Sequence, residues 1–198
     1  MSRIELLDPE SIDDRALQTV VDRIRENKAA SPDEDGRVPN HFRLEAHLPD
    51  VLRHVYEARV ALWEAGVLPQ TLLKKIAVAV SMANDCEYCT GAYCSILSAD
   101  LGGDERVREF QTRLREGDLD GLEGDVIDFA LTVLENPHGV DDGDFDRLRD
   151  EHGLSDAAFL QVLYAVNIVT AYNRVTTVFD ASYDHSYPSA WAEPVGDG

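Results

Sequence analysis

The sequence has few cysteines and no long apolar segment. Three cysteines occur in 198 residues, and all three lie between positions 86 and 94. Thiols so few and so clustered exclude the disulfide scaffold of a small secreted protein. No apolar run approaches the roughly 18 residues that a membrane-spanning helix needs. The first residues, Met1-Ser2-Arg3-Ile4-Glu5, lack the apolar core of a secretory signal, so we expect a cytoplasmic protein with no membrane partner.

Cations are also scarce. The chain has 18 Lys and Arg against 38 Asp and Glu, a formal net charge of −20, and its only lysines are Lys28, Lys74 and Lys75. Such a surface repels the phosphates of nucleic acid and of anionic lipid, so neither is expected as a partner. Because salt screens the repulsion between like charges, the acidic excess favours the cytosol of a halophilic microbe; the alternative is a protein that is merely acidic.

Apolar residues recur at helical spacing along most of the chain. The pattern predicts helices over about residues 13–28, 49–65, 69–83, 86–100, 105–115, 126–134, 141–152 and 156–181. A loop is expected over 29–41 and an irregular tail near the C-terminus. The continuous apolar run Ile76–Val80 predicts a helix buried on most sides. No segment alternates as a β-strand would, so the expected fold class is all-α.

The reactive groups of the chain are concentrated in the cysteine cluster. Cys86 and Cys89 are separated by two residues at the start of a predicted helix, where positions i and i+3 share a face. Their sulfurs are therefore expected within reach of one another, as a disulfide requires. A thiol near a helix N-terminus is also stabilised as a thiolate by unpaired backbone N–H groups. Asn84-Asp85 ends the preceding helix and is expected to cap this one.

Other uses of the cysteines stay open. Cys94 lies five residues after Cys89, off the shared face, and is expected to be a buried small apolar residue; a second resolving thiol is the alternative. The three thiols could instead bind a metal, with His41, His47 or His54 as the fourth ligand, but structural zinc usually takes two separated pairs. We therefore expect no metal and no other cofactor.

An ordered set of residues resembles a known family. Leu68-Pro69, then Ala79-Val80-Ser81, then Asn84-x-Cys86-x-Tyr88-Cys89 resemble the carboxymuconolactone decarboxylase/alkylhydroperoxidase D (AhpD-like) superfamily. The likeness covers about residues 38–180 and includes Asn136-Pro137 and Asn173-Arg174. It implies an all-helical AhpD-like fold and a homo-oligomer, either a trimer or a hexamer. The chain then divides into an N-terminal arm and helix (1–37), the AhpD-like domain (38–185) and the irregular tail (186–198).

The resemblance also implies a redox reaction. Redox members of the family are thiol peroxidases with peroxiredoxin-type activity, whose motif places a glutamate before the cysteine pair and a histidine after it. Carried over by position, Cys89 attacks the peroxide and Cys86 resolves the sulfenic acid into a disulfide. This sequence has Lys74 at the glutamate position and Tyr93 at the histidine position. Because neutral tyrosine, with a pKa of about 10, is a poor base near neutrality, the usual proton relay is absent, which argues against a vigorous peroxidase.

Lys74 and Tyr93 suggest a replacement for that relay. An ammonium near Cys89 would lower the pKa of its thiol by direct charge stabilisation. Tyr93 follows Cys89 by one helical turn and could hydrogen-bond the bound oxidant. The simpler alternative is that Lys74 points to solvent and that Tyr93 only packs.

Three functions from different classes follow. The first is a thiol-dependent peroxidase or disulfide reductase, acting on a peroxide or a disulfide and re-reduced by an unidentified thiol donor. The second is a carboxymuconolactone-decarboxylase-like enzyme, which only the superfamily name suggests. The third is a non-catalytic oligomeric protein that has lost the relay. Asn173-Arg174 is expected to be structural, with Arg174 bound to a carboxylate of another helix.

Overall fold

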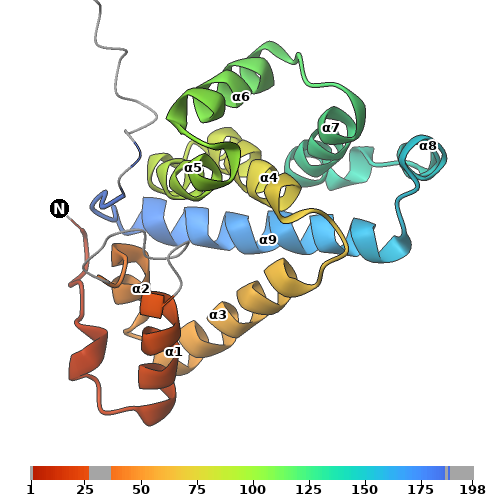
Figure 1. Ribbon diagram of the computed structural model, residues 1–198. Coiled ribbons are helices and arrows are strands. Elements are labelled where there is room, and N and C mark those ends of the chain that lie inside the picture. Colours follow the sequence, from red (N-terminus) through yellow and green to blue (C-terminus); the bar gives the residue numbers. More distant parts are fainter. Residues whose placement is uncertain (1, 27–36, 186, 188–198) are drawn as a thin grey trace, which may run out of the picture.

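The computed structural model describes residues 2–26, 37–185 and 187, and within them every regular element is a helix (Figure 1). In chain order the elements are η1 (Pro9–Ser11), α1 (Arg15–Glu26), α2 (Asn40–Glu45), α3 (Pro49–Glu64), α4 (Gln70–Ala83), α5 (Glu87–Leu101), α6 (Asp104–Glu116), α7 (Gly121–Glu135), η2 (Pro137–Gly139), α8 (Asp142–His152) and α9 (Asp156–Val178). The prediction of an all-α fold is confirmed for the described residues. Most of the expected loop over 29–41, and the expected tail except for residue 187, lie outside the described residues.

The sequence pattern does not predict the two short elements η1 and α2, and it places the end of α9 too late. Helix α2 begins at Asn40, inside the range expected to be loop, and η1 is a single 3₁₀ turn. Both are too short to display helical periodicity. Helix α9 ends at Val178 rather than near residue 181.

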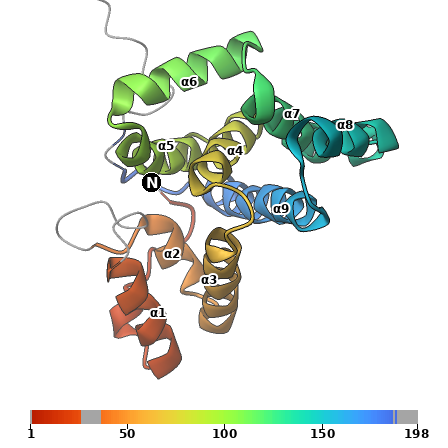
Figure 2. The ribbon, with the colours of Figure 1, turned by 45° about the vertical axis from the view of Figure 1, so that its right-hand side comes forward.

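The long helix α9 is the centre of the fold. Figures 1 and 2 show α4, α5 and α7 on one side of it and α3 on the other, and α4 packs on α5, α7 and α9 together. Because three helices surround α4, every residue of its apolar run Ile76–Val80 is at most 2% exposed. The prediction that this helix is buried on most sides is confirmed, and α4 carries the chain directly into the cysteine pair.

The apolar side chains form two cores. The larger is built from α4 to α9, and the smaller is built from α1, α2 and α3. In the smaller core, Leu17 and Ile24 of α1 are buried against Phe42 of α2 and Tyr56 of α3. Val38 belongs to it as well, so this core spans the division predicted after residue 37.

Two glycines end helices where the sequence predicts. Gly66 follows α3 with φ = 67°, and Gly153 follows α8 with φ = 68°. Only glycine adopts this left-handed backbone without a steric cost from Cβ. Ser155 then accepts a hydrogen bond from the Ala158 N–H at 3.3 Å and caps α9.

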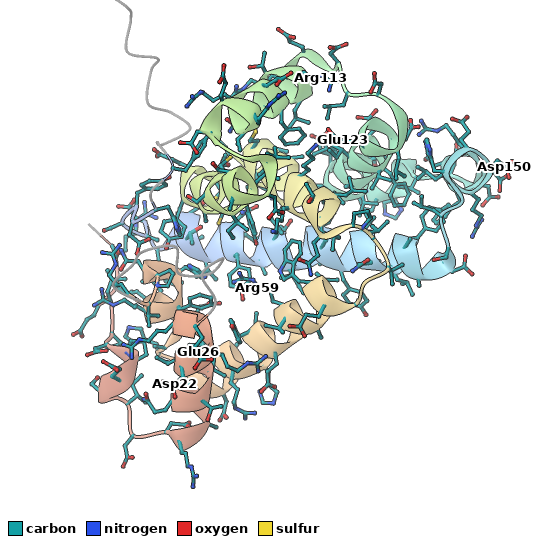
Figure 3. The ribbon with its side chains drawn as sticks, in the orientation of Figure 1. Asp22, Glu26, Arg59, Arg113, Glu123 and Asp150 are labelled. Carbon is teal, nitrogen blue, oxygen red and sulfur yellow. The ribbon has the colours of Figure 1, made fainter. Side chains whose placement is uncertain are left out.

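The outer surface carries the acidic excess. Exposed carboxylates such as Asp22 and Glu26 on α1 and Asp150 on α8 point away from the cores (Figure 3). Among the residues that the structure describes, no single helix has both the length and the apolar composition to cross a bilayer; α8 and α9 meet that test only as a pair bent by 118°.

Candidate active site

The turn between α4 and α5 positions the thiols of Cys86 and Cys89. Asp85 has φ = 55°, a left-handed backbone that Asp and Asn tolerate better than other non-glycine residues. The chain then enters α5 at Cys86, whose Sγ accepts a hydrogen bond from the backbone N–H of Cys89 at 3.3 Å. The expectation that Asn84-Asp85 caps α5 is therefore wrong. The sulfur of Cys86 takes the N–H group that a capping oxygen would otherwise take.

Both sulfurs are reduced and buried, and both contact one hydroxyl. Cys86 is 2% exposed and Cys89 is 4% exposed. The Oγ1 of Thr176 on α9 lies 3.1 Å from the Sγ of Cys86 and 3.3 Å from the Sγ of Cys89. The Thr176 hydroxyl can give its one proton to a sulfur or to the Tyr172 carbonyl at 3.0 Å, and its oxygen can accept from a thiol. Thr176 therefore contacts the two thiols at one point. The expected proximity of the sulfurs is confirmed.

The surroundings shift the two thiol pKa values in opposite directions. A hydrogen bond from the Cys89 thiol, helped by Thr176 and by the Cys89 N–H, lowers the pKa of Cys86 to about 6 against the opposing effect of burial. Burial, followed by the hydrogen bond and the charge of Cys86, raises the pKa of Cys89 well above its usual range. Near neutrality the thiolate therefore resides on Cys86, at the helix N-terminus, and the proton resides on Cys89.

Amide hydrogen bonds fasten the cysteine turn to α9. The Nδ2 of Asn84 donates to the Oδ1 of Asn173 at 2.8 Å, and the Nδ2 of Asn173 donates to the Oγ of Ser81 at 3.0 Å. Asn173 also hydrogen-bonds the Cys89 thiol, so it is structural, as expected, and also contacts the site. Arg174 is exposed and pairs with no carboxylate among the described residues. The interhelical ion pair expected for it is therefore wrong for that part of the chain.

Tyr88, between the two cysteines, ties the pair to distant segments. Its hydroxyl donates to the Oδ1 of Asp184 at 2.7 Å and accepts from the backbone N–H of His41 at 3.2 Å. Burial lowers the pKa of His41 well below its usual range, so its ring is neutral near pH 7. No spacing in the sequence points to Asp184, which lies 96 residues after Tyr88.

The other residues weighed from the sequence lie apart from the pair. His47 bonds the carbonyl of Glu5 at 2.9 Å, and His54 bonds that of Asp50 at 2.7 Å. The ligand set considered for a metal, three cysteines with one histidine, is not assembled among the described residues. Cys94 is fully buried in the larger core, and burial raises the pKa of its thiol to about 12. This burial matches the expectation of a small apolar residue.

Comparison with known proteins identifies the fold. No protein-family model matches the chain, and no curated protein matches it. A peroxidase-related protein from Ralstonia eutropha JMP134, described as an alkylhydroperoxidase AhpD core, has a TM-score of 0.79 at 26% sequence identity, with 92% of each chain covered. A peroxidase-related protein from Silicibacter sp. TM1040 has a TM-score of 0.78 at 21% identity, covering 94% of this chain and 93% of that chain.

This chain has the AhpD-like fold. The resemblance that the cysteine motif implies is therefore confirmed. Another structure with the AhpD-like fold is the debrominase Bmp8 in complex with 2,3,4-tribromopyrrole, with a TM-score of 0.71 at 18% identity, covering 93% of this chain and 94% of that chain. At that identity the likeness shows the fold alone.

The two positions at which this AhpD-like chain departs from the family motif line one cavity. Tyr93 is 6% exposed, and its ring centroid lies 6.3 Å from that of Trp63. The Nζ of Lys74 donates to the Oδ2 of Asp100 at 2.6 Å, and its side chain is only 16% exposed. Both line a cavity of about 180 Å³ that Arg59 also lines.

This placement bears on the expected role of Lys74. Lys74 does not simply point to solvent, and Asp100 neutralises the charge that was expected to act on Cys89. The main causes of the two thiol pKa shifts are hydrogen bonds and burial, and Lys74 is not among them. An effect of Lys74 on the pKa of Cys89 stays a prediction without support from the geometry. Tyr93 both packs against Trp63 and lines the cavity.

Replacing Thr176 with valine is expected to raise the pKa of Cys86. Valine keeps the branched shape but removes the hydroxyl that bonds both sulfurs. A hydrogen bond to a charged group is worth about 1.5–3 kcal/mol and one pKa unit about 1.4 kcal/mol, so the rise should be about 1–2 units. Ultraviolet absorbance of the thiolate across a pH series measures it. Thr132→Val is the matched control, because the Thr132 hydroxyl bonds a helix carbonyl on α7; an unchanged midpoint in Thr176→Val would contradict the prediction.

Proposed function

We propose that this chain is a thiol oxidoreductase in which Cys86 and Cys89 alternate between a dithiol and a disulfide while reducing a peroxide. The observation that carries the proposal is the contact of both sulfurs with Thr176, at 3.1 and 3.3 Å. The opposite pKa shifts add to it, because one sulfur is ionised while its neighbour keeps a proton. A two-electron dithiol reaction uses these two groups in turn.

The proposed cycle has three steps. A thiolate attacks the distal oxygen of the peroxide; the O–O bond breaks, the sulfur becomes a sulfenic acid, and the alkoxide leaves and takes up a proton from solvent. The second thiol attacks the sulfenic sulfur, forming the Cys86–Cys89 disulfide and releasing water. A dithiol donor then reduces the disulfide by two thiol–disulfide exchanges. The pair supplies two electrons to the peroxide and recovers them from the donor.

The roles within the cycle follow the resemblance. Cys89 is proposed as the attacking thiol and Cys86 as the resolving one. Tyr93, which lines the cavity one turn after Cys89, is proposed to hydrogen-bond the oxidant. Lys74, held by Asp100, is proposed to shape the same cavity. A reducing cytoplasm, as expected from the sequence, would supply the thiol donor.

Reductive dehalogenation is the second candidate function. Its support is the structural likeness to a debrominase in complex with a brominated pyrrole, together with the aromatic walls that Trp63 and Tyr93 give to the cavity. In that reaction two thiols and an aryl bromide would yield the disulfide, the debrominated ring and hydrogen bromide. The dithiol is again the electron donor, so both functions need the same pair. No feature of the described site favours lactone decarboxylation.

The test is peroxide consumption by the purified protein with dithiothreitol, at high salt to screen the net charge of −20. Turnover is expected in the wild type and in Cys94→Ala, and it should be lost in Cys86→Ser and in Cys89→Ser. The Cys94→Ala control keeps the pair and removes only the core thiol. Absence of peroxide turnover with reversible disulfide formation would move the assignment to a disulfide reductase or a dehalogenase. Failure to form the disulfide at all would refute the proposal and leave the non-catalytic alternative.

Assembly into a trimer or hexamer stays a proposal. It is supported by four large apolar side chains of α9 that lie exposed: Leu160 at 55%, Leu163 at 38%, Tyr164 at 57% and Val178 at 56%. Exposed apolar residues gathered on one element are typical of a surface that another chain covers. Sedimentation equilibrium gives the mass directly, and a monomer at all concentrations would rule the assembly out.

A further inference from the structure

The cavity beside Tyr93 has the size of a small ring. It lies between α3, α4 and α5 and measures about 180 Å³. Trp63, Tyr93 and Ile96 form apolar parts of its wall. An apolar cavity of about 150 Å³ is enough to bind benzene, so this one can hold a six-membered ring with a small substituent.

Arg59 brings a buried positive charge to this cavity. The residue is 9% exposed, and Figure 3 shows it between α3 and α9. Its guanidinium carbon lies 5.8 Å from the ring centroid of Phe42 and 5.7 Å from that of Tyr172. Within the described ranges no carboxylate lies at ion-pair distance from it. A buried guanidinium without a counter-ion loses several kcal/mol of hydration, which an anion at the same place would offset.

The neighbouring charges do not supply that anion. The other cation of the cavity, Lys74, is already paired with Asp100 at 2.6 Å. Glu45 acts on Arg59 only at longer range, and burial raises the pKa of Glu45 to about 7, so it is largely protonated below neutrality. Glu64 lines the cavity but is exposed. The charge of Arg59 is therefore available to a ligand.

Tyr93 is the lining residue that lies one turn of α5 after Cys89. Neither Cys86 nor Cys89 lines the cavity itself. A molecule anchored at Arg59 would have its remaining atoms beside Trp63 and Tyr93.

We infer that this cavity binds a small aromatic or cyclic apolar molecule that carries one carboxylate, with Arg59 bonding the carboxylate and Trp63 and Tyr93 packing on the ring. The inference goes beyond the proposed function, because this binding needs neither thiol. A guanidinium recognises a carboxylate with two parallel hydrogen bonds. The apolar walls select the ring, and the single buried charge selects one acid group.

Isothermal titration calorimetry with benzoate, using benzamide as the uncharged isostere, tests the inference. The wild type should bind benzoate more tightly than benzamide. Arg59→Met should weaken benzoate binding by about 10–100-fold, the range expected for a charge-assisted hydrogen bond, and should bind both probes alike. Arg53→Met is the matched control: Arg53 lies on the same helix and pairs with Asp50 outside the cavity, so benzoate binding should not change.

Two further variants keep the inference separate from the redox proposal. Trp63→Leu should weaken benzoate and benzamide by the same factor, because it removes part of the ring's packing surface and leaves the charge. The Cys86→Ser/Cys89→Ser double variant should still bind benzoate, since binding needs no thiol. Absence of benzoate binding to the wild type, or equal binding by Arg59→Met, would overturn the inference whatever the peroxide assay gives. If the wild type binds benzoate but shows no peroxide turnover, the result would count against the redox proposal alone.

Discussion

In a Cys89→Ser variant the thiolate of Cys86 is expected to form with a midpoint of about pH 6, whereas in Cys86→Ser burial should keep the pKa of the Cys89 thiol above its usual range. Serine at position 89 can still donate the hydrogen bond that stabilises the Cys86 thiolate. The backbone N–H of residue 89 and the Thr176 hydroxyl also remain. Burial, the largest cause of the Cys89 shift, is unchanged in Cys86→Ser.

The pH profile of alkylation by iodoacetamide is the measurement that separates the two thiols. Near pH 7 the thiolate fraction should be larger for Cys86, whose pKa is lowered, than for Cys89, whose pKa is raised. A thiolate of lower pKa is also a weaker nucleophile, with a Brønsted coefficient of about 0.4–0.5, which offsets part of that advantage in rate. The two thiols are therefore separated by the midpoints of their pH profiles, which should be lower for Cys86, rather than by their rates at one pH. Coincident midpoints would contradict the assignment of the thiolate to Cys86.

The same two variants decide which sulfur attacks. The family resemblance assigns attack to Cys89, yet the hydrogen bonds of the turn favour the thiolate on Cys86. A sulfenic acid trapped by dimedone in Cys86→Ser, after treatment with peroxide, would support attack by Cys89. A sulfenic acid found only in Cys89→Ser would transfer the attacking role to Cys86, the sulfur that caps the helix.

The sequence predicts the fold well where one helix buries a continuous apolar face. The run Ile76–Val80 specifies α4 because each of its side chains meets a neighbouring helix. The spacing of Cys86 and Cys89 likewise specifies their proximity, because it depends only on local helix geometry. Helix α2 is missed because its few residues, entered through Pro39 without a side-chain cap, show no period. Its existence depends on packing against α3 and α9.

The residues that contact the thiols could not be predicted from local sequence pattern. Thr176 reaches Cys86 across 90 positions of the chain. The signal available was that Asn173 and Thr176 continue the helical spacing of the apolar residues Val166 and Val169, since buried polar side chains are expected to have partners. That signal shows that a partner exists without naming it. The burial of Arg59 could not be predicted either, because arginine on a helix is usually exposed.

Glu45→Gln is expected to stabilise the protein at alkaline pH and to leave its stability nearly unchanged near pH 4. Burial raises the pKa of Glu45 from 4.5 to about 7, with Arg59 opposing the shift, and its Oε2 has no hydrogen-bond partner among the described groups. A carboxyl whose folded-state pKa is raised contributes stability below its unfolded pKa and loses it as the pH rises through the folded value. For Glu45 that window runs from about 4.5 to about 7.

The size of the effect follows from the shift. A difference of about 2.5 units corresponds to about 3 kcal/mol at full ionisation. Glutamine keeps the shape and cannot ionise, so above about pH 8 the variant should gain roughly 2–3 kcal/mol in free energy of unfolding. Urea titrations at the two pH values, in one salt concentration, measure it. Glu57→Gln, an exposed position on α3, is the control that makes the same change in net charge.

The sign at alkaline pH also tests the environment of Arg59. If an ionised Glu45 were the true counter-ion of that guanidinium, its removal would leave a buried charge unpaired, and breaking such a pair typically costs about 3–5 kcal/mol. Glu45→Gln would then destabilise the protein above about pH 8. A gain in stability shows instead that the carboxylate is the poorly solvated group and that Arg59 does not depend on it. The variant therefore tests, without any ligand, whether Arg59 is free to bind an external carboxylate.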